Sequence, residues 1–141
     1  MLNSIGFMPE AYRFGRGRTD TVLLVDDYVD ARVAMRDLLE ERGYPVIEAS
    51  NGQQALNLLV SQDTPRIGVI VLDLQMPVMD GFQFLKLLGN YVRLKNIPVI
   101  VVSACAGQLG EQERDRLAGC FQTPCDPTAL VEVVEACLTA P

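Results

Sequence analysis

Short apolar runs that alternate with helical patterns are the feature that most limits the fold of this chain. Three of these runs, Val22–Val25, Ile67–Leu72 and Ile97–Val102, are apolar at nearly every position. Strands that are buried on both faces of a parallel sheet have this composition, whereas strands with one solvated face alternate apolar and polar residues. Two weaker runs, Val46–Ala49 and Cys120–Gln122, complete a set of five predicted strands.

The segments between the runs have the periodicity of amphipathic helices. Apolar residues recur three or four positions apart, which places them on one side of a helix. The stripes are Ala31, Ala34, Met35 and Leu38; Ala55, Leu56, Leu59 and Val60; and Leu130, Val133, Val134, Cys137 and Leu138. Five strand-then-helix repeats predict an α/β fold, a doubly wound parallel five-stranded sheet with helices on both faces.

Capping residues precede three of the predicted helices. Ser50 with Gln53, and Asp80 with Gln83, have the spacing of a capping box. Asp126 lies directly before a proline, which suits a cap followed by the first helical position.

Composition excludes several classes of protein. The chain of 141 residues is 49% hydrophobic, which fits one globular domain. No apolar stretch approaches the roughly 18–20 residues of a membrane-spanning helix, and the N-terminus lacks a secretory signal pattern, so we expect a cytoplasmic protein. A net charge of −6 argues against nucleic-acid binding. The four cysteines lack C-x-x-C spacing and there is no histidine, so we expect ordinary thiols and no zinc site.

Residues 1–20 differ from the remainder in having no apolar period. We therefore divide the chain into a flexible N-terminal arm, 1–20, and a folded domain, 21–141. Gly15-Arg16-Gly17-Arg18 within the arm is also compatible with an RNA- or phosphate-binding segment.

Carboxylates follow two of the buried strands. Asp26 and Asp27 come after the first strand, and Asp73 comes after the third. The carboxyl ends of parallel strands share one edge of a sheet, where ligands of open α/β folds bind. Two like charges 4 Å apart repel by about 4 kcal/mol at an effective dielectric constant near 20, so such a cluster needs a cation or a shared proton. An all-oxygen set selects a hard divalent ion such as Mg²⁺. The alternative is that these acids only begin a helix and cap a turn.

The three stretches VLLVDD, VLDLQMPVMDGFQFLK and IPVIVVSA resemble the receiver domain of two-component response regulators. The resemblance runs from Thr21 to Leu138 and implies a CheY-like, flavodoxin-like (βα)5 sheet with strand order 2-1-3-4-5. It also implies that Pro77 sets a turn, that Gly81 lets the backbone enter the next helix closely, and that Met76 and Met79 are packing residues.

The resemblance also implies roles for the site residues. Asp73 would accept a phosphoryl group from a histidine kinase, a histidine phosphotransfer protein or acetyl phosphate. Asp27, Asp73 and the backbone carbonyl of Gln75 would bind Mg²⁺ directly, and Asp26 would act mainly through water. Ser103 would be the switch hydroxyl that meets the phosphoryl group.

Two positions depart from the family pattern. Thr123 stands where the family has a lysine, before Pro124, and the family's cis bond would carry over to Thr123–Pro124. Cys120 occupies the place of the switch aromatic, and Phe121 is expected to point to the opposite face. The segment between Ser103 and Thr123 is short. No other lysine or arginine is identified as a replacement, and an arm arginine (Arg13, Arg16 or Arg18) stays an unsupported option.

We therefore expect a stand-alone receiver that is not an enzyme beyond its own phosphorylation and dephosphorylation. Its output would be contact with a downstream protein through the face formed by the family's fourth helix, fifth strand and fifth helix, and a homodimer is left open. The alternative is an atypical receiver that binds partners without phosphorylation. A haloacid-dehalogenase-like phosphatase is disfavoured because Gln75 stands where a second aspartate is needed, and the chain lacks a dinucleotide-binding G-x-G-x-x-G motif.

Overall fold

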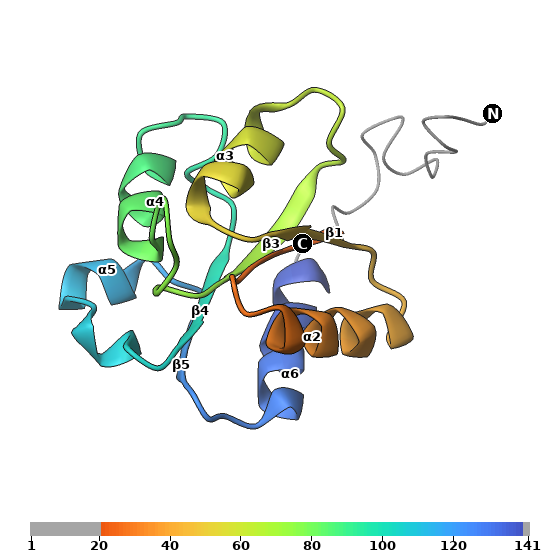
Figure 1. The fold of residues 1–141 in the computed structure, drawn as a ribbon. Helices are drawn as coiled ribbons and strands as arrows, with labels where there is room; N and C mark the ends of the chain where they lie inside the picture. The colour runs from red at the N-terminus through yellow and green to blue at the C-terminus, as the bar shows by residue number, and fades with distance from the viewer. Residues whose placement is uncertain (1–20, 140–141) are drawn as a thin grey trace.

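A computed structural model describes residues 21–139, which form one five-stranded parallel sheet in the order β2-β1-β3-β4-β5 (Figure 1). This order confirms the predicted fold. The strands are β1 (Thr21–Val25), β2 (Val46–Ala49), β3 (Ile67–Leu72), β4 (Val99–Ser103) and β5 (Gly119–Gln122). The fourth strand begins two residues later than expected, at Val99, because Ile97 lies in a bend and Pro98 has no amide proton to donate to a neighbouring strand.

Helices cover both faces of the sheet. The helix α2 (Val29–Glu41) and the C-terminal helix α6 (Pro127–Thr139) lie on one face, and α3 (Gly52–Val60) and α4 (Gly81–Leu88) lie on the other (Figure 1). Each face has its own core. In β1, Val22 and Leu24 point toward α2 and α6, whereas Leu23 and Val25 point toward α3 and α4. This alternation within one apolar run is why the run has no polar position.

The helix starts agree in part with the predicted caps. The Asp80 side chain accepts from the Gln83 amide in a complete capping box, and Asp126 accepts from the amide of Thr128 at 3.0 Å. The prediction for α3 was wrong by one residue. Asn51 is the N-cap and accepts from the amide of Gln54, because the Ser50 amide and hydroxyl instead bond to the side-chain oxygen of Gln54.

The predicted apolar stripe of α2 was also partly wrong. Ala31 and Ala34 are exposed, whereas Leu39, which lay outside the stripe, is fully buried. Larger side chains later in the helix reach the core, whereas Ala31 borders an open pocket at the carboxyl end of the sheet. In α3, Val60 is 55% exposed at the end of its stripe.

The connection between β4 and β5 is the most reduced part of the fold. It holds a 3₁₀ turn, Ala106–Gln108, and the helix α5 (Glu111–Asp115), which has five residues and none buried. Leu109 and Leu117, on either side of this helix, anchor the segment to the core of α3 and α4. The segment between Ser103 and Thr123, which the sequence shows to be short, is therefore accommodated by a short α5, and β4 and β5 still pair.

Several predictions concern small features of the chain. Met76 and Met79 pack against the core of α3 and α4, as expected. All four cysteines are free thiols. Within residues 21–139, no helix is long and apolar enough to cross a membrane. The predicted N-terminal arm lies outside the described residues.

Candidate functional site

The structure brings the three predicted carboxylates together at the carboxyl end of the sheet. Asp26 and Asp27 follow β1, Asp73 follows β3, and each offers an oxygen within 4.8 Å of the others. The backbone amide of Asp73 donates to the carbonyl of Val25 at 2.9 Å, so the register between β1 and β3 sets this approach. The donor set consists of oxygen alone and is half-buried to exposed, which fits a hard divalent cation such as Mg²⁺.

The surroundings of Asp26 raise the pKa of its carboxyl group. Burial raises the pKa of Asp26 to about 6, and the carboxylates of Asp73 and Asp27 act in the same direction. Its Oδ1 accepts from the backbone amide of Tyr28 at 2.9 Å, and this hydrogen bond and the charge of Arg32 oppose the rise in pKa. In the metal-free cluster Asp26 therefore takes up a proton as the pH falls to about 6, well above the range of an ordinary aspartate.

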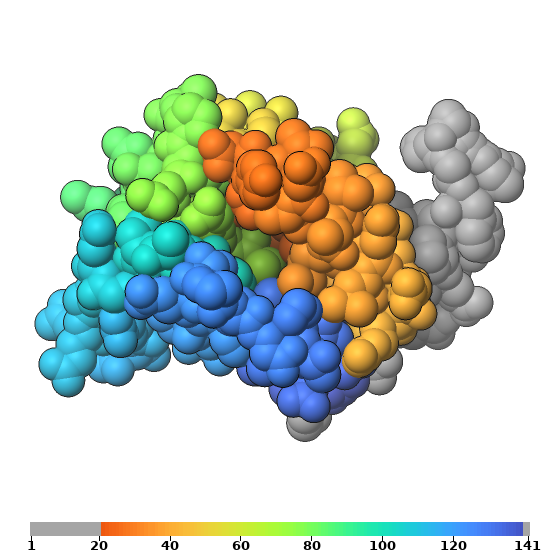
Figure 2. Space-filling view, turned by 60° about the horizontal axis from the view of Figure 1, so that its bottom comes forward, coloured from red at the N-terminus to blue at the C-terminus, as the bar shows by residue number. Residues whose placement is uncertain are grey.

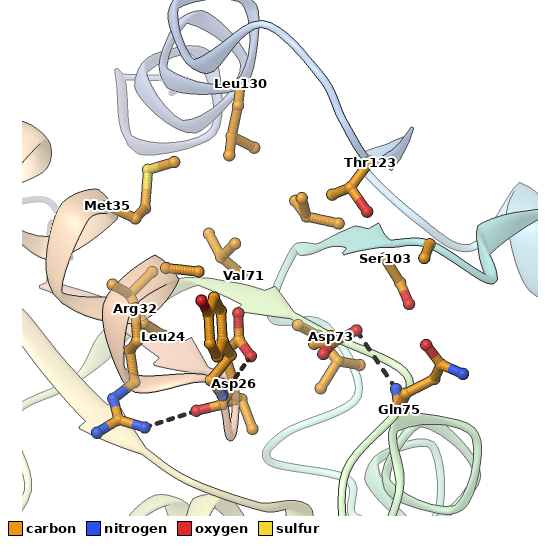
Figure 3. A pocket seen from close by; sticks show the side chains of 16 residues that line it. Leu24, Asp26, Arg32, Met35, Val71, Asp73, Gln75, Ser103, Thr123 and Leu130 are labelled. Atoms are coloured by element: carbon orange, nitrogen blue, oxygen red, sulfur yellow. Dashed lines mark hydrogen bonds between the residues drawn. The ribbon is translucent and has the colours of Figure 1, made fainter.

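Arg32 is a site residue that the sequence reasoning missed. Its guanidinium donates to the backbone carbonyl of Asp26 at 2.6 Å (Figure 3). It also donates to Glu48 on β2 at 2.8 Å. Arg36 also binds Glu48, and the Arg32 hydrogen bond holds the pKa of Glu48 below its usual range. A cation is thus present beside the acids. The only signal in the sequence is its place one turn into α2, where arginine is also common on a solvated face.

The loop that carries Asp73 is held closely by its neighbours. The backbone amide of Gln75 donates to Asp73 Oδ1 at 3.3 Å, and the amide of Gly81 donates to the Leu74 carbonyl at 3.0 Å. A Cβ at Gly81 would lie 2.5 Å from the Asp73 carbonyl and 2.7 Å from the Cα of Leu74. The predicted close entry into α4 is therefore present, and glycine is required for it.

The same loop contains an unusual turn at Val78. Val78 has a φ of 68° and is 80% exposed, and the amide of Met79 donates to the Pro77 carbonyl at 2.8 Å. An i to i+2 hydrogen bond around a residue of positive φ is a strained γ-turn. A β-branched residue suits this conformation poorly. The loop next packs on α3, where the Gly52 amide donates to the Met79 carbonyl.

Ser103 ends β4 and is buried at 1% exposure. Its hydroxyl accepts from the backbone amide of Cys105 at 3.3 Å and contacts the Cys105 sulfur at 3.4 Å. Figure 3 places Ser103 on the same side of the sheet end as Asp73 and Gln75. The hydroxyl is therefore at the site, and its hydrogen-bond partner is Cys105 of the loop that follows β4.

Thr123 and the β5 residues lie where the sequence placed them. The Thr123 amide donates to the Ser103 carbonyl at 3.2 Å, and the Thr123–Pro124 bond is cis, as expected. Phe121 packs into the core of α2 and α6, whereas Cys120 is exposed. Cys120 and Phe121 therefore point to opposite faces of the sheet, as predicted.

These residues surround a pocket of about 350 Å³. Asp26, Asp73, Ser103 and Thr123 line its polar end. Met35 of α2 and Leu130 of α6 face each other across its apolar part (Figure 3). The surface is visibly hollow between the orange β1–α2 region and the blue C-terminal region (Figure 2). Threonine in place of a long side chain at position 123 leaves this space open.

Comparison with known proteins identifies the class that this fold and site define. The family model for the response regulator receiver domain matches residues 22–135. The chain belongs to the response regulator receiver family. Proteins of this family take part in phosphoryl transfer and interact with histidine kinases or phosphotransfer proteins and with downstream partners.

Individual relatives agree with this assignment. The polar-differentiation response regulator DivK of Brucella anthropi is 34% identical over 115 residues, which cover 82% of this chain and 90% of the relative. The receiver domain of the Francisella response regulator 1452 is 27% identical with a TM-score of 0.73, covering 85% of this chain and 97% of that one. The chemotaxis response regulator CheY4 of Vibrio cholerae is 26% identical, with a TM-score of 0.70 and coverage of 85% and 99%.

Proposed function

We propose that this receiver accepts a phosphoryl group on Asp73 in a reaction that depends on Mg²⁺. The observation that carries the proposal is the approach of Asp26, Asp27 and Asp73 to within 4.8 Å at the edge of the sheet. These carboxylates, with the backbone carbonyl of Gln75, would hold the ion. The ion would neutralise charge on the transferring oxygens. A solved structure of the response regulator TrrA from Thermotoga maritima, 22% identical to this chain, is described as a complex with Mg²⁺ and BeF.

The chain's own residues supply the remaining chemistry. A carboxylate oxygen of Asp73 attacks phosphorus, the bond from phosphorus to the donor's histidine nitrogen breaks, and an acyl phosphate forms on Asp73. The Gln75 amide orients the carboxylate through its bond to Oδ1. Ser103 would leave Cys105 and donate its hydroxyl proton to a phosphoryl oxygen. Thr123 would add one neutral hydrogen bond, weaker than one from an ammonium group.

The phosphoryl group would bias a protein-binding face made of α5, β5 and α6. Phe121 of β5 packs into the core that α2 and α6 form on one face of the sheet. The strand β5 is therefore coupled to α6 more directly than to the short α5. We expect no activity on other substrates, because the site modifies its own aspartate. We also propose that the protein is cytoplasmic and that a histidine kinase or a phosphotransfer protein donates the phosphoryl group. Pairing of two copies is part of the same proposal.

The test is the intact mass of the protein after incubation with acetyl phosphate and Mg²⁺. We expect the mass to rise by one phosphoryl group, and the gain to disappear with Asp73→Asn or with excess chelator. An unchanged mass with acetyl phosphate and also with a phosphohistidine donor, although calorimetry detects Mg²⁺ binding, would contradict phosphoacceptance.

A second candidate function is protein binding without phosphorylation. Thr123 favours it, because this neutral side chain gives the acid site no ammonium group to pair with a phosphoryl group. Under this alternative, Asp73→Asn would bind the downstream partner as tightly as the natural protein does.

A further inference from the structure

A second hollow lies away from the acid site, between α4 and α5. It has a volume of about 830 Å³ and extends along α4 from Phe82 to Gly89. Its other wall is formed by Glu113, Arg116 and Leu117, and the start of β4 closes its base. The groove exists because α5 has only five residues and buries none of them against α4.

The base of the groove is apolar. Phe82 and Leu85 of α4 line it and are only partly buried, and Ile97 and Leu117 meet them from the β4 and α5 sides. These side chains belong to the edge of the core of α3 and α4. The groove therefore offers apolar surface that no described segment of the chain covers.

The edges of the groove are basic in a protein whose net charge is −6. Lys86, Lys95 and Arg116 line it, and none of them takes part in an ion pair within residues 21–139. The only acid in the lining is Glu113, whose carboxylate accepts from the Gly110 amide at 2.7 Å at the start of its own helix. Three cations therefore face the groove, and its single carboxylate is bound to its own backbone.

Arg116 lies near the C-terminal end of α4. One of its guanidinium nitrogens lies 3.5 Å from the position that a Cβ at Gly89 would occupy, beside the last carbonyls of α4. The negative end of the helix dipole favours a cation there. The guanidinium thus lies at one end of the groove, next to the C-terminus of α4.

We propose that this groove binds an acidic amphipathic helix of a partner protein. The apolar side of such a helix would cover Phe82 and Leu85, and its carboxylates would meet the three cations. The groove runs beside the eight residues of α4, which span about 12 Å, so two to three helical turns of the partner would fill it. The chain's own residues 1–20 are a poor occupant, because they carry three arginines and two acids.

The test is selection from a displayed library of amphipathic segments of about 16 residues, which would span about 24 Å as helices. The apolar stripe is fixed, and every other position can be acidic, basic or neutral. We expect the natural protein to enrich acidic segments with a Kd on the order of 10 µM. We expect the triple variant Lys86→Glu, Lys95→Glu, Arg116→Glu to weaken binding by at least about tenfold. Arg66→Glu, one charge reversal at an exposed position outside the groove lining, is the control and should leave binding unchanged.

Amide chemical shifts locate the selected segment. We expect changes at residues 82–89, 95–99 and 113–117, with little change at Asp26 and Asp73. The proposal is overturned by enrichment of basic or neutral segments, by binding that survives the triple reversal, or by shifts confined to another face. Two further results overturn it: binding only to anionic lipid vesicles, and self-association of the protein that the triple reversal abolishes.

Discussion

Arg32 holds the backbone of Asp26 from one turn into the following helix. Its guanidinium lies 2.6 Å from the Asp26 carbonyl oxygen and is fixed on its other side by Glu48 at 2.8 Å. The loop between β1 and α2 is thereby tied to β2. Groups that orient a metal-binding loop from behind commonly change metal affinity by 10- to 100-fold, roughly, when they are removed.

We predict that Arg32→Gln weakens Mg²⁺ binding by about tenfold, because the loop that carries Asp26 and Asp27 loses its anchor. Calorimetric titration with Mg²⁺ measures this directly. Arg36→Gln is the matched control, since Arg36 shares Glu48 as a partner but is not bonded to Asp26. Equal losses in both variants would show that the charge near Glu48 matters and the bond to Asp26 does not.

The raised pKa of Asp26 predicts that Mg²⁺ binding depends on pH. Its pKa is about 6 in the metal-free protein, above the value of 3.8 for an unperturbed aspartate. The folded state therefore binds more protons than the unfolded state between these values, and this group favours folding more as the pH falls from 7 toward 4. Mg²⁺ must displace that proton, so we expect affinity to fall by up to about tenfold per pH unit below pH 6.

The same titration repeated from pH 7.5 to pH 5 measures this dependence. Asp26→Asn should bind Mg²⁺ more weakly at neutral pH but with a flatter pH profile, because asparagine has no proton to release. A profile equally steep in the variant would assign the proton to another group.

Thr123→Lys should reduce the dependence of phosphorylation on Mg²⁺. A lysine side chain would enter the pocket of about 350 Å³ and place an ammonium group near Asp73. A charge-assisted hydrogen bond in place of a neutral one contributes about 1 kcal/mol more, or roughly fivefold in the concentration of Mg²⁺ needed for half-maximal phosphorylation. Thr123→Met fills similar space without charge, and an equal effect from methionine would mean that filling the pocket, and not charge, is responsible.

Gly81→Ala should destabilise the fold and disturb the site together. The added methyl group would meet the backbone of Asp73 and Leu74 at 2.5 to 2.7 Å, so the phosphoacceptor loop has to move. We expect a loss of about 3 kcal/mol in the free energy of unfolding, measured with urea. Gly107→Ala is the control, because its nearest neighbour would be Gln122 Oε1 at an ordinary 3.6 Å.

Val78→Asn should stabilise the protein by about 1 kcal/mol, because asparagine tolerates positive φ better than a β-branched residue does. Val92→Asn makes the same exchange at a matched exposure of 78%, compared with 80% for Val78, and Val92 has no positive φ. Urea unfolding of both variants separates backbone strain from loss of exposed apolar surface. Stabilisation by the two substitutions to the same extent would place the effect in surface composition.

The sequence was sufficient for the sheet and for the acid cluster because both follow from local pattern. Five apolar runs predicted the strands, and the acids at the ends of the first and third runs had to meet once these strands became neighbours. The opposite orientations of Cys120 and Phe121 followed from alternation along one strand.

Arg32 and Val78 could not be predicted in the same way. The bond from Arg32 to the Asp26 carbonyl depends on where the backbone turns after β1, and no spacing of residue types records that. The positive φ of Val78 contradicts the preference of its own side chain and occurs in a loop whose next residue, Met79, is bonded to α3. The one-residue error at Asn51 reflects the same limit, since two adjacent polar residues can both cap a helix.

The five exposed residues of α5 have a consequence for local unfolding. A helix that buries no side chain is stabilised by its own backbone bonds and by Leu109 and Leu117 on either side. Its amides should exchange with solvent through local openings long before those of β1 and β3, whose strands are buried in both cores. The α5 segment between Leu109 and Leu117 can therefore open and re-form on a much shorter timescale than the sheet.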